Sequence, residues 1–432
     1  QVSRGSMHLV LVSSLVPVEN PSSGFDIANR AVLDGLRALG HRVSVIGYLQ
    51  PGQSAAADGD TYLLGELEVA NAKVGAVTKL RWLATAVLYR TTLSSAKMLK
   101  TGRRHIEMLL QGLQPFDGII LNSVQLPGAF APVFQKHPTI YVAHNVEADS
   151  ALENAASASG LLEKFLFKRE ASLLEEVERQ LTQAASAIWT FAEADRFGFG
   201  YAVSDRAAVL PLVTCWELPE SGEERLPEHD LALIGTWSWK PNRIGLDWFL
   251  SKVVPLLPAD MSIGVAGQVE DVPAVSHPGL RFLGRVPDAR AFVEAGAVVP
   301  LISRGGTGVQ LKTIESFELG MPSVATRASL RGIGEIPGNC SIADDPVEFA
   351  RLLAEKVAQV RAGNRQRLSG SAFHRAQKAR LLETLKRGLA GLATPVTGPA
   401  PRFSKEQTAP PLMKEKLRTP HGFAVHEGGK SR

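Results

Sequence analysis

Short apolar runs alternate with amphipathic segments along most of the chain. In the first half, apolar runs typical of strands occur at residues 9–12, 43–46, 118–121, 139–142, 187–190 and 208–210. A helical pattern follows the first run from Ile27 to Leu39 and ends at Gly40, and a longer one covers about residues 161–185. This order predicts a βαβ opening and a parallel sheet covered by helices.

The same alternation restarts in the second half. Strands are predicted at residues 231–234, 262–266, 281–283, 298–302 and 323–326, with helices near 245–257, 288–295, 346–362 and 369–389. The polar segment 217–228 separates the halves. We therefore predict an α/β protein with domains at 7–216 and 217–362, and a C-terminal helix at 363–392 that returns to the first domain.

The two ends of the sequence lack this pattern. Residues 1–6 look like a cloning remnant before a natural start at Met7, and we leave them out of the fold prediction. Residues 393–432 are rich in Pro, Thr, Lys and Gly with almost no apolar pattern, which predicts a mobile tail.

Composition narrows the class of protein. A chain of 432 residues with 45% hydrophobic and 21% charged residues is typical of a soluble protein of two domains. No apolar run approaches the roughly 18 residues that span a bilayer, and no secretory signal is recognisable. Cys215 and Cys340 have no metal or redox spacing and favour a reducing cytoplasm. The net charge of +4 is too small to indicate nucleic-acid binding.

The charge is nevertheless uneven. Residues 69–106 contain eight basic residues and no acidic one, with apolar residues at roughly helical intervals; the basic residues are Lys73, Lys79, Arg81, Arg90, Lys97, Lys100, Arg103 and Arg104. A basic amphipathic helix can rest on an anionic membrane surface. The alternative is a solvated helix face packed on its own domain, and both interpretations remain open at this point.

The stretch from Arg304 to Leu319 combines an anion site with a carboxylate. It reads RGGTGVQLKTIESFEL and follows the strand predicted at 298–302. Thr307-x-x-Gln310 has the spacing of a capping box, so a helix is predicted to begin there with its N–H groups and dipole available to an anion. Lys312 and Glu315 share a face of this helix. A phosphate bound near residues 306–309 beside hydroxyls bound by Glu315 describes a nucleotide sugar.

Two positions in the first half lie where open parallel sheets bind ligands. Gly24 is in the turn after the first strand, and His144 follows the strand at 139–142. Gly24 is either a phosphate-loop residue or only a turn residue. His144 is either a ligand contact or a loop histidine bonded to neighbouring backbone.

Several segments in combination resemble a known family. They are GTWSWKPN at 235–242 followed by Trp248-Phe249, LRFLGRVPD at 280–288, GGTGVQLKTIE at 305–315 and LGMPSVAT at 319–326. With them the chain resembles GT-B glycosyltransferases of the family-4-like type, the glycosyl transferases group 1. SGF at 23–25, LGHRV at 39–43 and HNVE at 144–147 also fit, so the resemblance covers about Leu9 to Ala350. It implies two Rossmann-like domains facing each other across a cleft, the first binding acceptor and the second binding donor.

The resemblance also implies roles for single residues. Glu315 matches a glutamate that binds the nucleotide ribose, and Lys240 or Arg243 stands where the family has a cation on the diphosphate. His144 matches a histidine that contacts the transferred sugar. The expected catalytic residues are His144, Lys240 and Glu315, and the expected donor site comprises Gly24, Thr236, Arg243, Arg285, Val286, Gly305, Gly306, Thr307, Gly308, Val309, Gln310, Lys312 and Glu315. In that site the loop amides would hold the diphosphate and sugar, and the backbone of Arg285 and Val286 the base.

Three positions depart from the family pattern. Thr307, eight residues before Glu315, stands where many relatives have a glutamate that contacts the donor sugar. Thr236 replaces a common arginine, and Ala192 a common serine. Backbone amides must therefore do part of the work, or the donor is held differently.

The expected reaction is sugar transfer from a nucleoside-diphosphate sugar. Charge builds on the leaving diphosphate and on an oxocarbenium-like sugar, so fixed dipoles and a cation supply most of the catalysis. The resemblance implies a hexosyltransferase type that retains anomeric configuration, with the departing phosphate helping to deprotonate the acceptor. No paired aspartates with metal-ligand spacing occur, so neither a metal nor a cofactor is expected beyond the nucleotide-sugar co-substrate.

Other functions remain open from the sequence. A nucleotide-sugar epimerase would need acid and base groups around the sugar, and a non-catalytic glycosyltransferase-like binding protein is compatible with Thr307 and Thr236. For a transferase, the basic segment predicts a saccharide or lipid-linked saccharide acceptor. The expected setting is cytoplasmic, at the inner face of an anionic membrane, in the biosynthesis of cell-surface polysaccharide or lipopolysaccharide.

Overall fold

The structure is a computed structural model that describes residues 5–21, 23–56, 60–68, 75–158, 160–201, 204–219, 226–271, 275–305, 308–364 and 366–393. Four of the sequence-based predictions concern residues outside these ranges: Lys73, Gly306, Thr307 and the tail from residue 394 onward.

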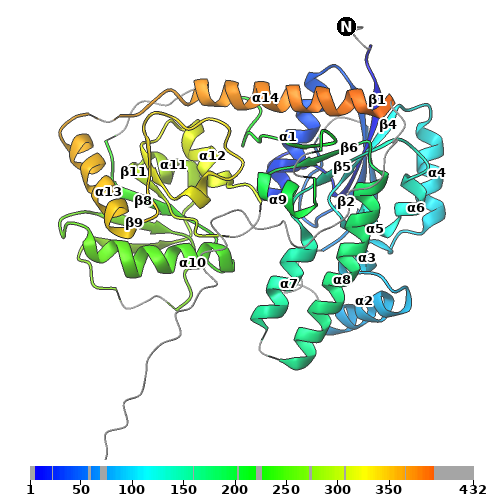
Figure 1. Cartoon of the computed structure of the whole chain (residues 1–432), viewed down its shortest axis with the longest axis horizontal. Coiled ribbons are helices and arrows are strands. Elements are labelled where there is room, and N and C mark those ends of the chain that lie inside the picture. The colour runs from blue at the N-terminus through cyan, green and yellow to red at the C-terminus, as the bar shows by residue number, and fades with distance from the viewer. Residues whose placement is uncertain are drawn as a thin grey trace, which may run out of the picture.

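Over the described residues, the N-terminal domain is built on a seven-stranded parallel sheet (Figure 1). The strand order is β3–β2–β1–β4–β5–β6–β7. In chain order the bounds are β1 His8–Leu15, β2 Arg42–Leu49, β3 Thr61–Glu66, β4 Gly118–Asn122, β5 Thr139–Ala143, β6 Ala187–Thr190 and β7 Ala207–Val209. Leu9 and Leu11 of β1 pack on one face of the sheet, and Val10 and Val12 on the other. Because both faces are covered, the strand is continuously apolar.

Helices cover both faces of this sheet. The first begins where a capping box forms: the Ser23 hydroxyl accepts from the Asp26 N–H, and the Asp26 carboxylate accepts from the Ser23 N–H. The helices are α1 Gly24–Ala38, α2 Ala76–Leu88, α3 Leu93–Met98, α4 Arg103–Leu113, α5 Gln125–Ala129, α6 Ala131–Phe134, α7 Glu147–Ser157, α8 Leu161–Ala184 and α9 Glu193–Gly198. The basic segment 69–106, which has no acidic residue, thus contributes to three short helices, α2 to α4, rather than to one long helix. New helices begin after the N-cap residues Thr92 and Gly102.

The C-terminal domain has a six-stranded parallel sheet within the described residues, ordered β10–β9–β8–β11–β12–β13. The strands are β8 His229–Ile234, β9 Ile263–Ala266, β10 Leu280–Gly284, β11 Gly296–Leu301, β12 Ser323–Ala325 and β13 Cys340–Ile342. The α-helices are α10 Lys240–Trp248, α11 Ala289–Glu294, α12 Leu311–Glu318 and α13 Pro346–Arg361. A short π-helix, η2 Phe249–Val253, and two 3₁₀ helices, η3 Val254–Leu256 and η4 Arg327–Leu330, complete the domain's described helices.

One long helix joins the two domains. Helix α14 Gly370–Ala390, followed by η5 Gly391–Ala393, packs against α12 in the second domain and against α1, β6 and β7 in the first (Figure 1). Its side chains also hold the interdomain segment: Gln377 donates to the Leu212 carbonyl at 3.2 Å, and Lys378 to the Trp216 carbonyl at 2.7 Å. The domains are therefore tied at one side, along α14.

The observed architecture confirms the predicted fold class, an α/β protein of two Rossmann-like domains. None of the helices in the described ranges is both long and apolar enough to cross a membrane.

Candidate active site

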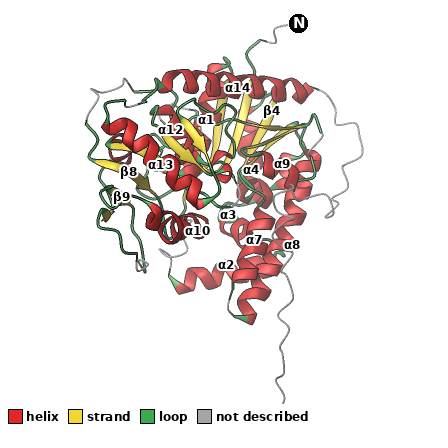
Figure 2. Cartoon of the chain, turned by 60° about the vertical axis from the view of Figure 1, so that its left-hand side comes forward, coloured by secondary structure: helices red, strands yellow, loops and turns green. Residues whose placement is uncertain are grey.

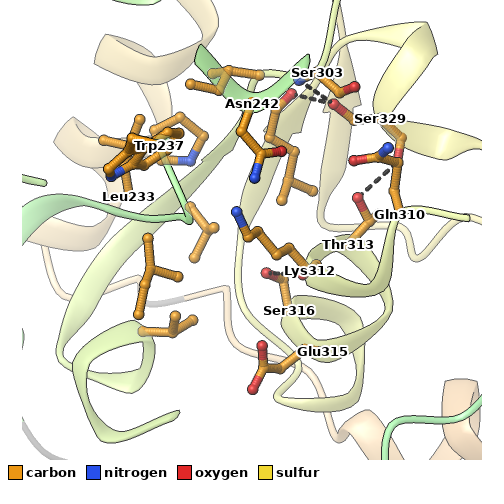
Figure 3. Close-up of a pocket in the computed structure, with 16 residues that line it drawn as sticks. Leu233, Trp237, Asn242, Ser303, Gln310, Lys312, Thr313, Glu315, Ser316 and Ser329 are labelled. Atoms are coloured by element: carbon orange, nitrogen blue, oxygen red, sulfur yellow. Dashed lines mark hydrogen bonds between the residues drawn. The ribbon is translucent and has the colours of Figure 1, made fainter. Parts of the chain in front are cut away.

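Strand order places a candidate ligand cleft in the C-terminal domain. Successive strands are added on one side of β8 as far as β10 and on its other side from β11 onward, so the strand order reverses between β8 and β11. In an open parallel sheet, the carboxyl ends of the strands at such a point form a crevice for ligands. The cleft found there is lined by the ends of these two strands, by α12 and by the segment 237–242 (Figure 3). Its empty space, open solvent included, is about 570 Å³.

The floor of the cleft is held by hydrogen bonds. The Ser329 hydroxyl accepts from the Ser303 N–H at 2.9 Å and donates to the Leu301 carbonyl at 2.7 Å. The Thr313 hydroxyl donates to the Ser329 carbonyl at 2.6 Å (Figure 3). These bonds tie α12 to the ends of β11 and β12, so side chains on the exposed face of α12 project from a rigid base.

Lys312 supplies the positive charge of the cleft. Its ammonium group is directed into the open space (Figure 3) and lies 5.1 Å from the centre of the Trp237 ring. Burial lowers the pKa of Lys312 from 10.5 to about 8, and the Glu315 carboxylate opposes this shift. A half-buried cation without full solvation is well suited to bind a multiply charged anion.

Glu315 lies one turn along the same helix and lines the same cleft (Figure 3). Its pKa is raised, first by burial and then by Glu318 nearby, while Arg290 and Lys312 oppose the rise. Lys312 and Glu315 therefore form a polar wall of the cleft, with the ammonium group at the start of α12 and the carboxyl group one turn further along the helix.

The predicted start of this helix is wrong. Helix α12 begins at Leu311 with Gln310 as N-cap and no side-chain cap, rather than at a capping box on Thr307. Gly308 has φ = 76°, which turns the chain, and the Gln310 N–H donates to the Arg331 carbonyl at 3.3 Å. The free amides at the helix start are consequently those of Leu311 and Lys312 by position, not that of Gln310.

Arg331 binds the backbone of the glycine-rich loop. Its guanidinium donates to the carbonyls of Gly308 at 3.2 Å and Gly305 at 3.1 Å. Val309 packs partly buried against the hydrophobic core. Arg331 thus fixes the backbone at the described residues Gly305 and Gly308.

His144 sits at the corresponding edge of the first sheet in a chain of side-chain hydrogen bonds. Asn29 donates to the Leu15 carbonyl at 3.0 Å, so its Oδ1 accepts from Asn122 Nδ2 at 2.6 Å. Asn122 Oδ1 then faces His144 Nε2 at 2.9 Å, which requires a proton on that nitrogen. Burial lowers the pKa of His144 to about 3, so the ring is neutral and Nδ1 is its acceptor.

Aromatic rings fix the orientation of His144. Phe25 stacks on it with ring centres 4.6 Å apart, and Phe191 meets it edge-on at 4.9 Å. The neighbouring Asn145 contacts the glycine-rich loop at Gly308, because a Cβ on Gly308 would lie 2.7 Å from Asn145 Oδ1. Gly24 also contacts the second domain, since a Cβ there would lie 3.0 Å from Leu311 Cδ1. The structure therefore brings Gly24, His144, Gly308 and the start of α12 together.

Arg243 and Lys240, the two cations expected at the diphosphate, differ in their contacts and in their position relative to the cleft. Arg243 is committed elsewhere: it pairs with Asp247 at 2.8 Å and donates to the carbonyls of Glu270 and Asp271. Its nitrogens thus anchor the 270–271 turn in this structure, and its expected place at a diphosphate stays a prediction. Lys240 is exposed at the start of α10, outside the residues that line the cleft.

The remaining predicted donor residues lie at the rim. Thr236 is exposed just after β8, and its carbonyl accepts from Asn242 at 3.1 Å. Arg285 is exposed after β10, whereas Val286 is half-buried against the core. Gln310 lines the cleft itself.

Comparison with known proteins addresses the family. Residues 228–359 match the family model of the glycosyl transferases group 1, and the match contains every residue that lines the cleft. The C-terminal domain belongs to this family. A search of the curated proteins finds no match.

Solved structures resemble the fold over most of the chain. Sucrose-phosphate synthase from Thermosynechococcus elongatus is 14% identical, with 89% of this chain and 97% of that chain covered and a TM-score of 0.55. HepE from Anabaena in complex with UDP and glucose is 13% identical, with coverages of 89% and 98% and a TM-score of 0.53. The catalytic domain of starch synthase IV from Arabidopsis thaliana, bound to ADP and acarbose, is 12% identical, with coverages of 90% and 100% and a TM-score of 0.51. The family match and this GT-B fold together make the protein a glycosyltransferase.

Several residues of the glycosyltransferase site were not predicted from the sequence. Trp237 and Asn242 line the cleft, although both lie in the quoted segment 235–242. Asn122 sets the tautomer of His144, and a polar residue ending the apolar run 118–121 was a visible signal. Arg331 and Asp195, which meet at the glycine-rich loop, carry no local sequence signal, because their partners are distant in the chain.

A cluster of possible metal ligands lies away from the cleft. Among the described residues, the ligand atoms of Cys215, Glu318 and His374 lie within 4.8 Å of one another. Hydrogen bonds already engage them: His374 Nδ1 bonds Glu318 at 3.0 Å, and the Thr214 N–H donates to Glu318 at 3.1 Å. This group connects α12, α14 and the interdomain segment of the glycosyltransferase.

Proposed function

We propose that the protein transfers a hexose-type sugar from a nucleoside-diphosphate sugar to a saccharide or lipid-linked saccharide acceptor, with retention of anomeric configuration. The observation that carries the donor half of this proposal is the pair Lys312 and Glu315 on one wall of the cleft in the family-matched domain.

The diphosphate would lie at the start of α12. The first-turn N–H groups of Leu311 and Lys312 and the positive end of the helix dipole attract an anion there, and the Lys312 ammonium adds a full charge. Glu315, one turn further along, would accept hydrogen bonds from the ribose hydroxyls. The complexes of HepE with UDP-glucose and of starch synthase IV with ADP support a nucleotide ligand, and their bases differ.

The sugar would extend toward the first domain. His144 is neutral and presents Nδ1 as an acceptor, so it would position a sugar hydroxyl and would not act as a general acid. Breaking the bond to the diphosphate needs stabilisation of the leaving charge, which Lys312 and the helix start would supply. The departing phosphate would then take the acceptor proton, so the reaction needs neither a metal nor a protein base.

A donor-dependent transfer assay tests this proposal. A thermal-shift screen of nucleoside-diphosphate sugars first identifies the donor, since a bound ligand stabilises according to its affinity. Glu315→Ala should then reduce transfer and nucleotide affinity strongly, whereas Glu355→Ala on α13 should leave both unchanged. Lys240→Ala tests the exposed lysine at the rim, and near-normal rates in both Glu315→Ala and Lys240→Ala would remove the site assignment. Full activity with a chelator is expected.

The exposed surface of α2 supports the acceptor half of this proposal. Of the α2 residues from Val77 to Leu88, only Ala86 is buried, and Trp82 and Thr85 are half-buried, so one narrow edge contacts the domain. The other sides carry large apolar side chains at high exposure: 83% for Val77, 67% for Leu80 and 76% for Leu88. The alternative that this segment packs on its own domain therefore fits α3, whose residues 95–98 are buried, but not α2.

A second apolar surface lies beside it. The first turns of α8 expose Leu161 by 87% and Phe165 by 65%. Figures 1 and 2 both show α2 beside α8 at the end of the domain away from α14, and Arg169 of α8 donates to the Ala86 carbonyl at 3.0 Å. Apolar side chains flanked by Lys79 and Arg81, in a segment without acidic residues, fit an anionic lipid surface.

We infer that this surface, the exposed side of α2 with the start of α8, rests on the cytoplasmic face of a membrane and receives a lipid-linked acceptor for cell-surface polysaccharide or lipopolysaccharide. Sedimentation with anionic vesicles at low salt tests it. Lys79→Glu with Arg81→Glu should abolish binding, while Lys386→Glu with Arg387→Glu on α14, the same charge change elsewhere, should not. Absence of binding, or binding that survives reversal on α2, would remove the membrane assignment.

A further inference from the structure

The carboxyl group of Asp195 is buried where the N-terminal domain meets the donor loop. Asp195 belongs to α9, which lies between the two sheets (Figure 1), and is 1% exposed. Neither carboxylate oxygen makes a well-aligned hydrogen bond with a described residue. The Gly308 N–H and the Arg331 guanidinium of the other domain lie close enough to act on its charge.

Two glycines of the C-terminal domain let its backbone approach the N-terminal domain closely at this point. A Cβ on Gly308 would lie 2.7 Å from Asn145 Oδ1, and a Cβ on Gly332 would lie 2.8 Å from the Phe191 carbonyl oxygen. Arg331, which precedes Gly332 in the chain, donates to the carbonyls of Gly308 and Gly305. The cover over Asp195 therefore includes the loop that borders the donor cleft, and separating the domains would return its carboxyl to water.

The charges around Asp195 do not compensate for its burial. Burial raises its pKa to about 7; Gly308 and Arg331 oppose the rise, and Asp149 and Glu147 of α7 add to it. In contact with water the same carboxyl would have a pKa near 4. The closed arrangement thus holds a proton that an open arrangement releases across roughly this pH range.

We propose that Asp195 is a positioning residue that couples closure of the two domains at the donor loop to the uptake of one proton. The sign follows from linkage: between about pH 4 and 7 the closed form is protonated and the open form is not, so rising pH opposes closure, and above about 7 the dependence ends. A bound diphosphate near the loop also favours the neutral carboxyl. This last consequence rests on the proposed nucleotide-sugar donor.

A ligand-free measurement tests the coupling by itself. X-ray scattering of the full chain at pH 5.5 and 7.5 should show a larger radius of gyration for the wild type at pH 7.5. Asp195→Asn, which mimics the protonated carboxyl, should keep the compact value at both, and Asp195→Ser provides a second neutral variant. Glu193→Gln on the same helix, 51% exposed at its side chain, should behave as wild type. A wild type that does not expand, or an Asp195→Asn variant that expands equally, overturns the proposal.

Titration calorimetry with UDP extends the test to the donor site. Wild-type affinity should fall at least fivefold from pH 5.5 to 7.5, with heats that depend on the buffer because a proton is taken up. Asp195→Asn should lose the part of both effects that comes from the protein and keep only the part that comes from the titration of UDP itself. Binding with equal pH dependence in both proteins refutes the coupling, whereas absence of nucleotide binding at any pH refutes the proposed function and leaves the scattering result decisive.

Discussion

Replacing Lys312 by methionine removes the one ammonium group among the described residues that line the proposed donor cleft. It keeps an unbranched side chain against Trp237. The lysine lies in the first turn of α12, so its backbone amide remains in place. The change therefore isolates the contribution of the positive charge to binding of a nucleoside diphosphate.

The magnitude follows from the environment of the charge. The pKa of Lys312 is lowered from 10.5 to about 8, which corresponds to about 3 kcal/mol of unfavourable charging at 1.36 kcal/mol per pKa unit. A diphosphate beside the ammonium relieves that cost, and hydrogen bonds to charged groups contribute about 1.5–3 kcal/mol. We therefore expect UDP to bind about 10- to 150-fold more weakly to Lys312→Met at pH 7.

The protonation of Lys312 also makes the affinity for UDP depend on pH. The free lysine loses its proton above about pH 8, whereas a bound diphosphate raises its pKa, so binding takes up a proton there. Lys312 should cause no pH dependence of the wild-type affinity below about pH 8, and above it the affinity should fall by up to about tenfold per pH unit. This range lies above that expected for Asp195, so the two effects separate.

Calorimetric titration of UDP from pH 7 to 9.5 measures both effects. Lys312→Met should show the weaker affinity and no loss above pH 8, and Lys252→Met, which removes an exposed lysine of the same domain, should match the wild type. Equal affinities for Lys312→Met and wild type at pH 7, or equal slopes above pH 8, would refute the assignment of Lys312 to the phosphates.

Three further predictions concern the loop, the first domain and the interdomain segment. Gly308→Ala forces a Cβ at φ = 76° to within 2.7 Å of Asn145 Oδ1, so donor kcat/KM should fall on the order of 10-fold or more; unchanged kinetics would show that the loop geometry does not matter. His144→Phe should slow transfer, and the wild-type pH–rate profile should have no limb from this residue between pH 5 and 8, because its pKa is lowered to about 3. Glu318→Ala leaves buried partners of its carboxylate unpaired and should lower the free energy of unfolding in urea by about 3 kcal/mol, against about 0.5 or less for the exposed Glu383→Ala.

Much of the fold was readable from the sequence because local pattern and tertiary environment agree. The run Leu9-Val10-Leu11-Val12 is apolar on both faces, and the structure buries both faces of β1. The edge strand β3 was missed, since all six of its residues are exposed or half-buried and its polar and apolar residues have no clear period. Strand β13 was missed for a related reason, as it is a three-residue edge strand that pairs, among the described residues, with β12 alone.

The sequence by itself determined the two α/β halves, the glycine-rich loop and the shared helix face of Lys312 and Glu315, because each depends on residues close together in the chain. Only the tertiary structure decided the start of α12 and the commitment of Arg243. The first depends on a turn at Gly308 and a bond to Arg331, and the second on carbonyls about 27 residues away. It likewise decided that α2 is exposed and that Asp195 is buried. Exposure and pKa depend on which distant segments cover a side chain, and no local pattern specifies that cover.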